Sequence, residues 1–357
     1  MSPLLKQVSD AGVSGVKRKS SPWEMTPADF FTESQEARRL FARLVNANEA
    51  DIAIVPSASY GMATAAKNLP IDKSQHIIVL EDQFPSNIYC WQELAKSKGA
   101  ALKTIPVPTD KDWTSAVLEN IESTTAMAAL PHCFWTDGSL LDLEAIGTRL
   151  REVGAKLALD VTQSLGAMPL DVQKIKPDFL VAACYKWLLG PYSVGFLYVA
   201  PDQQTGAPLE HNYINRKGSE NFARLVDYQE EFQPGATRFD MGERANFALM
   251  PMAIAALQQI LDWGVQDIYK TLAAKTAALA EAGQEIGLTC VESHLRAGHF
   301  LGLEFTNGVP DTLLSKLAED RIYVSVRGNS LRVTPHLYNT DEDADRLMSA
   351  LRKTTGK

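Results

Sequence analysis

Hydrophobic positions in the first part of the chain follow two alternating periods. Short continuous apolar runs, typical of buried strands, lie at residues 51–56, 76–81, 126–133, 156–161, 179–185 and 194–200. Segments with apolar residues three or four apart predict helices at residues 33–44, 57–69, 88–98 and 143–154. Strands that alternate with helices predict an α/β fold, in which helices cover both faces of an open, mostly parallel sheet.

The pattern changes after residue 200. Residues 201–240 are polar and irregular, so we expect loops with short ordered pieces, and a loop of this length is more often functional than idle. An apolar helix is predicted at residues 247–263, and a mixed α+β tail is predicted from residues 268–287, 300–305, 311–320, 322–326, 330–334 and 341–352. We therefore expect a large α/β domain over residues 15–249 and a small α+β domain over residues 250–357 together with residues 1–14.

Composition and charge narrow the class of protein. The 357 residues are 45% hydrophobic and 22% charged, which are ordinary globular values. The net charge of −8 argues against nucleic acid or an anionic membrane as a partner. No apolar run has the length of a membrane span, the first residues lack the apolar core of a signal peptide, and the four cysteines form no Cys-x-x-Cys pair. We expect a cytoplasmic protein without a zinc site or a disulfide framework.

The most informative residue is Lys186, which follows the apolar run of residues 179–185, whereas Asp160 lies near the end of the run of residues 156–161. Parallel sheets bind ligands outside the carboxyl ends of their strands, so both side chains are expected to face one crevice. A lysine in apolar surroundings has a lowered pKa, and its free amine can attack a carbonyl, which indicates Schiff-base chemistry. Taken singly, a lysine that reaches solvent and an aspartate that caps a loop explain the two residues equally well.

Two further segments could contact a flat, phosphorylated ligand. Residues 57–61 (Ser-Ala-Ser-Tyr-Gly) open a predicted helix, where free backbone N–H groups suit a phosphate and Ser57 and Ser59 add hydroxyl donors. A plain serine N-cap accounts for the same sequence. Phe84 follows a predicted strand and could stack on a flat ring, although Pro-Ser-Asn after it also favours a simple turn.

Arg332 lies within an apolar strand of the tail, where a substrate carboxylate or an internal salt bridge would serve as its partner. His294 and His299 do not have the spacing of a metal-ligand pair, so no metal site is predicted. The chain has neither a Gly-x-Gly-x-x-Gly motif nor a Walker-type lysine loop, which weakens a nucleotide-binding hypothesis.

Taken in order, these segments resemble the class V aminotransferase family of pyridoxal-phosphate-dependent enzymes (fold type I). The similar segments are residues 57–61, 84–87, 132–138, 160–166, 183–190, 239–246 and 332–339, and the likeness covers nearly the whole chain. Phe-Pro-Ser-Asn, Trp-Thr-Asp-Gly and Cys-Tyr-Lys resemble the isopenicillin N epimerase-like and kynureninase-like branches more than the cysteine desulfurases. The resemblance implies a mostly parallel, seven-stranded-type sheet in the large domain and a smaller α+β C-terminal domain.

The resemblance also implies the two catalytic residues. Lys186 would form an internal aldimine with pyridoxal 5′-phosphate and later remove the Cα proton of the substrate as a general base. Asp160 would pair with the pyridine nitrogen of the cofactor and keep the ring cationic.

The remaining implied residues bind the cofactor or the substrate. Gln163 and His132 would contact the ring hydroxyl, and Phe84 would stack on the ring. The phosphate would be held by residues of the same chain and by Asn246 of a second subunit; the former are Ser57, Ala58, Ser59, Tyr60 and Tyr185. Arg332, at the carboxylate, and Asn87 would hold the amino-acid substrate. A homodimer with shared active sites is therefore expected.

Two departures from the family pattern bear on activity. Desulfurases carry a mobile cysteine a few residues before the arginine, but residues 325–330 contain none, so persulfide chemistry is not expected. Family members usually carry a segment ahead of the Ser-Pro-Leu-like start, whereas this sequence begins near that point, so the start is expected to be truncated or the pocket to be built differently. The resemblance favours aminotransferase-like or carbon–sulfur lyase chemistry. A kynureninase-like hydrolase, an amino-acid epimerase and a non-catalytic scaffold or regulator with this fold remain alternatives.

Overall fold

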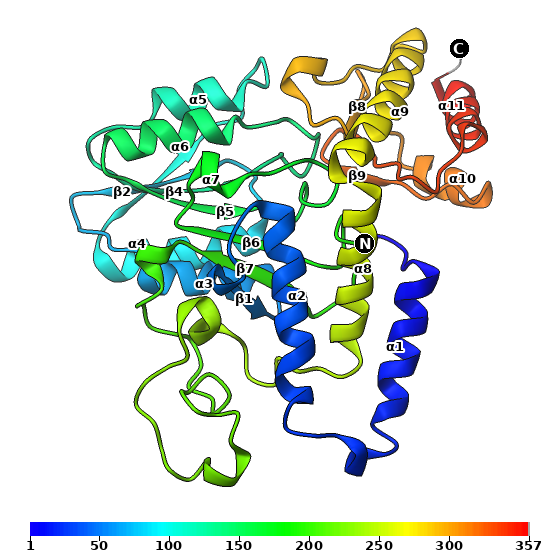
Figure 1. Ribbon diagram of the computed structural model, residues 1–357. Coiled ribbons are helices and arrows are strands. Elements are labelled where there is room, and N and C mark those ends of the chain that lie inside the picture. Colours follow the sequence, from blue (N-terminus) through cyan, green and yellow to red (C-terminus); the bar gives the residue numbers. More distant parts are fainter. Residues whose placement is uncertain (356–357) are drawn as a thin grey trace.

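A seven-stranded sheet forms the centre of the molecule. The computed structural model describes residues 1–355 (Figure 1). The strands are β1 (Ile52–Val55), β2 (His76–Leu80), β3 (Ala101–Ile105), β4 (Thr125–Pro131), β5 (Lys156–Asp160), β6 (Phe179–Ala183) and β7 (Gly195–Val199). Their order is β1-β7-β6-β5-β4-β2-β3, and only β7 runs antiparallel to its neighbours. The predicted mostly parallel sheet is confirmed.

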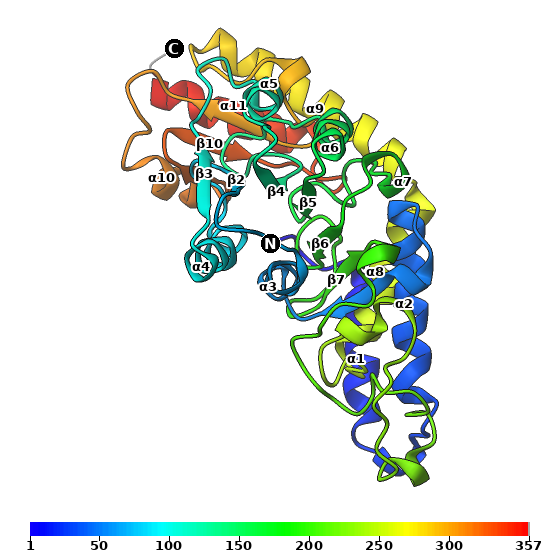
Figure 2. The same cartoon turned by 90° about the vertical axis from the view of Figure 1, so that its left-hand side faces the viewer.

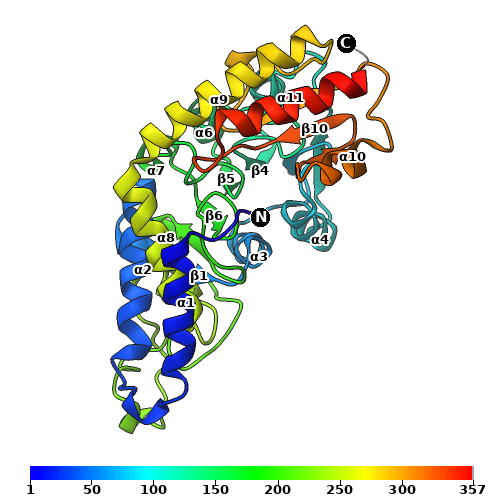
Figure 3. The same cartoon turned by 90° about the vertical axis from the view of Figure 1, so that its right-hand side faces the viewer.

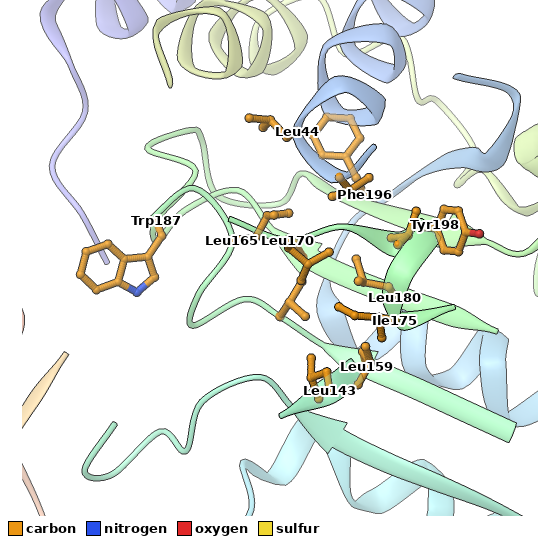
Figure 4. Packing of buried hydrophobic residues seen from close by; sticks show 14 of the residues in the cluster. Leu44, Leu143, Leu159, Leu165, Leu170, Ile175, Leu180, Trp187, Phe196 and Tyr198 are labelled. Atoms are coloured by element: carbon orange, nitrogen blue, oxygen red, sulfur yellow. The ribbon is translucent and has the colours of Figure 1, made fainter. Parts of the chain in front are cut away.

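Both faces of this sheet are buried, which explains why its strands are continuous apolar runs. Successive residues point to opposite faces, so Ile78 of β2 lies in one hydrophobic cluster and Ile77 in another. Figure 4 shows the first cluster, in which Leu159, Leu180 and Phe196 of three strands pack together. The sheet is thereby held as a rigid layer, and its strand ends become fixed positions for functional side chains.

Helices cover the two faces (Figures 1 and 2). One face contacts α3 (Ala58–Asn68) and α4 (Tyr89–Lys98). The other face contacts α2 (Asp29–Val45), α5 (Trp113–Glu119), α6 (Leu143–Glu152) and α7 (Val172–Ile175). Short 3₁₀ turns lie between the main elements, namely Pro22–Glu24, Glu49–Asp51, Pro85–Asn87, Pro201–Gln203, Phe222–Arg224, Gly235–Phe239 and Ser293–Leu295. The expected loops with short pieces at residues 201–240 are confirmed.

A smaller three-stranded sheet follows in the last part of the described chain. Its antiparallel strands are β8 (Leu301–Glu304), β9 (Ser325–Arg327) and β10 (Ser330–Val333), in the order β8-β10-β9. Helices α9 (Val265–Glu285), α10 (Leu313–Glu319) and α11 (Asp341–Thr355) accompany it (Figure 3). Its apolar side chains form a cluster of their own, as the predicted α+β tail requires.

Helices α1 (Lys6–Arg18) and α8 (Leu249–Trp263) pack against each other. An added Cβ on Gly12 would lie 2.6 Å from Met252 Sδ, so the small residues of α1 allow the close approach. Residues of α8 such as Met250 and Leu257 also join the core of the large sheet. The division into domains at residues 249 and 250 therefore stays a prediction.

The hydrophobic pattern did not predict α1, β3, α5 or α7. Strand β3 is an edge strand with partly exposed positions at residues 101–104, so it lacks a continuous apolar run. Helix α1 contains Gly12 and Gly15, which have low helix propensity. Among residues 1–355, no helix is both long and apolar enough to cross a membrane.

Candidate active site

The carboxyl ends of three parallel strands meet at one place. In the pairing of β4 with β5, Pro131 lies beside Asp160, and in the pairing of β5 with β6, Asp160 lies beside Val181. The chain leaves β6 at Ala183 and reaches Lys186 within three residues. The crossover connection between two parallel strands therefore brings Asp160 and Lys186 to the same edge of the sheet, as their positions in the sequence predict.

A small cavity opens at this edge. Asp160 and Lys186 both line it, together with Ala58, Phe84, Asn87, Gln163 and Tyr185 from the predicted set. Five more residues line it, namely Gln83, Pro131, Cys133, Trp135 and Thr162. The structure does not place Ser57, Ser59, Tyr60, His132, Asn246 or Arg332 on its wall.

Lys186 is partly buried, and its amine contacts aromatic faces. The Nζ lies 5.2 Å from the centre of the Phe84 ring and 5.7 Å from the centre of the Tyr185 ring. Burial lowers the pKa of Lys186, and the charges of Arg332 and Arg327 lower it further, whereas Asp160 opposes them. Within residues 1–355 this amine has no hydrogen bond or ion pair, so it is free to react.

Asp160 is 8% exposed at the end of β5. One carboxylate oxygen, Oδ1, accepts a hydrogen bond of 3.0 Å from the backbone N–H of Thr162. The other oxygen, Oδ2, makes no hydrogen bond to the part of the chain that the structure describes. Thr162 Oγ1 in turn accepts from the Ala183 N–H at 3.1 Å, which ties the Asp160 turn to β6. A fixed carboxylate with an unused oxygen therefore lies beside the lysine.

Helix α3 begins next to the cavity with the predicted Ser-Ala-Ser-Tyr segment. Ser57 is its N-cap and accepts from the Tyr60 N–H at 3.2 Å, so the serine-cap interpretation is confirmed. The hydroxyls of Ser57 and Ser59 are 2.9 Å apart, and Ala58 lines the cavity. A cap and an anion site are compatible, because the other N–H groups of the first turn have no helical partner.

The turn after β2 supplies Phe84 and Asn87. Gln83 holds this turn, because its side chain donates to Asn87 O at 2.7 Å and to Ala129 O at 3.0 Å. Asn87 is 1% exposed, and its Oδ1 accepts from the Trp91 indole at 3.0 Å. Its Nδ2 is buried without a hydrogen-bond partner. An unsatisfied donor on the cavity wall is unusual, so Asn87 Nδ2 is available to a ligand that accepts from it.

Gln163 directly follows the Asp160 turn, and His132 directly follows β4. The Gln163 side-chain amide makes no hydrogen bond within residues 1–355, whereas its carbonyl oxygen is 2.6 Å from His299 Nε2. His132 Nδ1 is 3.1 Å from Ser164 Oγ, and burial lowers the pKa of His132 to about 4. Gln163 is thus available to a ligand in the cavity, and His132 is a neutral imidazole behind it.

Arg332 and Asn246 lie outside the cavity wall. Arg332 extends from β10, with its guanidinium carbon 5.0 Å from the centre of the Phe300 ring and its buried Nε unpartnered. Its charge nevertheless lowers the pKa of Lys186, so it lies near the lysine. Asn246 is exposed, and its Oδ1 accepts from the N–H groups at the start of α8, at 2.9 Å from Leu249. Its cross-subunit role stays a prediction.

The N-terminal residues also reach this site, which the sequence did not reveal. The backbone N–H of Ser2 donates to Tyr185 O at 3.1 Å. Figures 1–3 show the N-terminus near the centre of the molecule. Burial, and then the charges of Lys186 and Arg332, lower the pKa of the Met1 amino group, so the first residues lie near the lysine.

Two further residues that line the cavity, Trp135 and Cys133, were not among the predicted site residues. Trp135 belongs to the Trp-Thr-Asp-Gly segment, where only the family likeness pointed to it, and its indole donates to Asp82 O at 2.7 Å. Cys133 reads as a core residue in the sequence, and it is fully buried. Burial raises the pKa of Cys133 to about 12, and its thiol donates to Gln163 O. In residues 1–355 there is no group of three His, Cys, Asp or Glu side chains able to hold a metal ion.

Comparison with known sequences places the chain in a family. Residues 18–347 match the family described as Aminotransferase class-V. An uncharacterized aminotransferase, YcbU, of Bacillus subtilis is 28% identical, over 87% of this chain and 81% of the relative. A probable cysteine desulfurase of Methanothermobacter thermautotrophicus is 25% identical (90% and 84%), and the isopenicillin N epimerase of Streptomyces clavuligerus is 22% identical (90% and 84%).

Comparison with solved structures agrees. The cystine C–S lyase C-DES, solved with its reaction product cysteine persulfide, superposes with a TM-score of 0.86 at 20% identity, over 98% of this chain and 94% of the lyase. At this identity the likeness concerns the fold, which is the predicted one. The chain belongs to the class V aminotransferase family of pyridoxal-phosphate-dependent enzymes.

Proposed function

We propose that this enzyme binds pyridoxal 5′-phosphate through Lys186 and acts on a primary amino acid, by aminotransferase-like or carbon–sulfur lyase chemistry. One observation carries the proposal. An amine without a protein partner and a carboxylate with an unused oxygen line the same cavity. Asn87 Nδ2 on the same wall is buried without a hydrogen-bond partner, and such groups are rare in folded proteins, so the three together favour a bound molecule that supplies the partners.

The residues present fit the cofactor. The start of α3 offers free N–H groups and the Ser57–Ser59 hydroxyl pair to a phosphate. The ring face of Phe84 suits stacking on a flat heterocycle. Asp160 suits a protonated ring nitrogen, and the free amide of Gln163 suits a ring hydroxyl. Bound there, the cofactor supplies an aldehyde carbon and a ring that accepts an electron pair.

The protein residues would then bind and orient the substrate and move its Cα proton. Burial lowers the pKa of Lys186, which favours the neutral amine that would take the proton from Cα of the substrate. Arg332, whose charge acts on Lys186, would bind the substrate carboxylate and so choose which Cα bond is broken. The fixed carboxylate of Asp160 would stabilise positive charge on the ring of the bound cofactor.

The cysteines give no support to a persulfide mechanism. Of the residues that line the cavity, Cys133 is the one with a thiol, and its raised pKa keeps that thiol protonated. A thiolate is the nucleophile in sulfur transfer. We therefore favour transamination or elimination of a sulfur-bearing side chain over desulfuration through an enzyme cysteine.

We also propose a homodimer in the cytoplasm. The exposed position of Asn246 and the polar loop of residues 201–234 suit contacts with a second subunit. The four cysteines are free thiols, which suits a reducing compartment. Sedimentation together with kinetics tests the dimer, because a fully active monomer would contradict it.

The substrate screen is the test of function. The purified enzyme is loaded with pyridoxal phosphate, and each amino acid is added while the visible band of the cofactor is followed. A shift identifies a substrate; pyruvate plus a thiol as products indicates a lyase, and an amine passed to a keto acid indicates a transaminase. A loaded enzyme whose band shifts with no amino acid would refute the proposal and favour a scaffold.

A further inference from the structure

The site holds more positive charge than one substrate carboxylate requires. The groups whose charges act on Lys186 include Asp160, Arg332 and Arg327. The pKa of Arg332 is itself lowered to about 10, first by burial and then by Arg327. Within residues 1–355 neither arginine has a carboxylate at ion-pair distance. Positive groups near the lysine, which include Arg332, Arg327 and the Met1 amino group, therefore outnumber the one carboxylate, Asp160.

Arg327 and Arg332 lie on the same face of the small sheet. Arg327 ends β9 and pairs with Ser330 of β10, and Arg332 lies two residues beyond Ser330. Residues two apart on a strand share a face, so the two arginines are diagonal neighbours, about 7–8 Å apart at the backbone. Two side chains placed in this way can hold the two ends of one small molecule.

A chain of aromatic contacts connects Arg327 to the reactive lysine. Its guanidinium carbon lies 5.6 Å from the centre of the Trp135 ring, which lines the cavity. The Trp135 and Phe84 rings meet edge to face at 5.6 Å, and Lys186 lies over Phe84. The hydrogen bond from the Trp135 indole to Asp82 O fixes the position of the Trp135 ring. Arg327 is exposed, yet its head group is held at the rim of the site.

We propose that Arg327 determines substrate specificity by binding a second carboxylate, so that the substrate is an amino acid with an acidic side chain. A guanidinium held over a ring face still has an N–H fork for a bidentate carboxylate. Arg332 takes the α-carboxylate and Arg327 the distal one. This inference rests on the proposed function and names the substrate class for the same site.

The experiment compares pairs of amino acids that differ in one charge. Aspartate with asparagine, and glutamate with glutamine, are titrated into the loaded enzyme, and apparent dissociation constants are read from the shift of the visible band. We expect the acid of each pair to bind more tightly. Arg327→Gln should raise the dissociation constant of the acid by about 10–100-fold, because one charge-assisted contact is lost. The dissociation constant of the amide should change by less than about 2-fold. Arg327→Lys should bind the acids with an intermediate affinity, because lysine keeps the positive charge but lacks the forked N–H groups of arginine.

The matched control is Arg149→Gln, which removes an exposed arginine paired with Glu152 on α6. It should change none of the four constants. Amides that bind as tightly as acids, or an Arg327→Gln loss that is equal for both, would overturn the assignment while leaving the proposed function intact. A band that responds to no amino acid in the unchanged enzyme would instead mean that the proposed function has failed.

Discussion

The side-chain nitrogen of Lys186 lies 5.2 Å from the centre of the Phe84 ring, although the two residues come from different strand ends. The lysine follows β6 and the phenylalanine follows β2, which are separated in the sheet by β5 and β4. The contact therefore depends on the whole central sheet. It places the amine in a partly buried position, and burial lowers the pKa of Lys186.

Replacement of Lys186 tests the central assignment. In Lys186→Ala we expect no visible band that borohydride bleaches, because the amine that carries the cofactor is gone. Turnover should fall by at least about 10²–10⁴-fold, the usual contribution of proton transfer. Absorbance spectra and steady-state rates measure both effects.

Lys186→Arg is the control for charge, since it keeps a cation but lacks a free amine at ordinary pH. It should resemble the alanine variant in spectrum and rate. Normal turnover in either variant would show that another group performs the chemistry.

The pH at which Lys186 reacts should respond to its neighbours in opposite directions. Asp160 raises the pKa of Lys186, so Asp160→Asn should move the labelling midpoint to lower pH. Arg327 lowers that pKa, so Arg327→Gln should move the midpoint to higher pH. Trace acetylation of the cofactor-free protein across a pH series, quantified at Lys186 by peptide mass spectrometry, gives the midpoints.

The exposed Lys174 in the same samples is the internal control, and its curve should be the same in all three proteins. Shifts of Lys186 in one direction for both variants would indicate a change of structure and not of charge.

Hydrophobic periodicity predicted the strands that carry the site, because six of the seven are continuous apolar runs. The position of Asp160 and Lys186 after neighbouring parallel strands then followed from general topology. The contact of Ser2 with Tyr185 O could not be predicted, since a backbone hydrogen bond leaves no side-chain signal. Arg327 was also missed, because an exposed arginine near a turn is ordinary and only its contact with Trp135 distinguishes it.

Gly166 controls the position of the lysine loop. Its φ is +99°, and an added Cβ would lie 2.4 Å from the carbonyl oxygen of Trp187, the residue after Lys186. Gly166→Ala should therefore combine backbone strain with a clash that displaces this loop. We expect a loss of about 2–5 kcal/mol in the free energy of unfolding, and weaker binding of pyridoxal phosphate. Urea unfolding and cofactor titration measure the two effects.

Gly154→Ala is the control that separates backbone strain from the steric clash expected in Gly166→Ala. Gly154 also has a positive φ, +75°, but nothing lies within 4 Å of an added Cβ. It should cost about 1–2 kcal/mol and leave cofactor affinity unchanged. Equal effects of the two substitutions on stability and affinity would mean that the Trp187 contact does not matter.

Asp240 holds the buried charges behind β1, and its removal should destabilise the whole fold. It is fully buried, pairs with Arg38 and with Arg244 at 3.0 Å, and accepts from the Ile54 N–H at 2.7 Å. Asp240→Ala leaves two guanidinium groups without their counter-ion, so we expect a loss of about 3–5 kcal/mol in the free energy of unfolding. Glu152→Ala, which breaks an exposed pair, should cost less than about 1 kcal/mol in the same urea titration. Similar losses would contradict this account, because burial is what makes an unpaired charge costly.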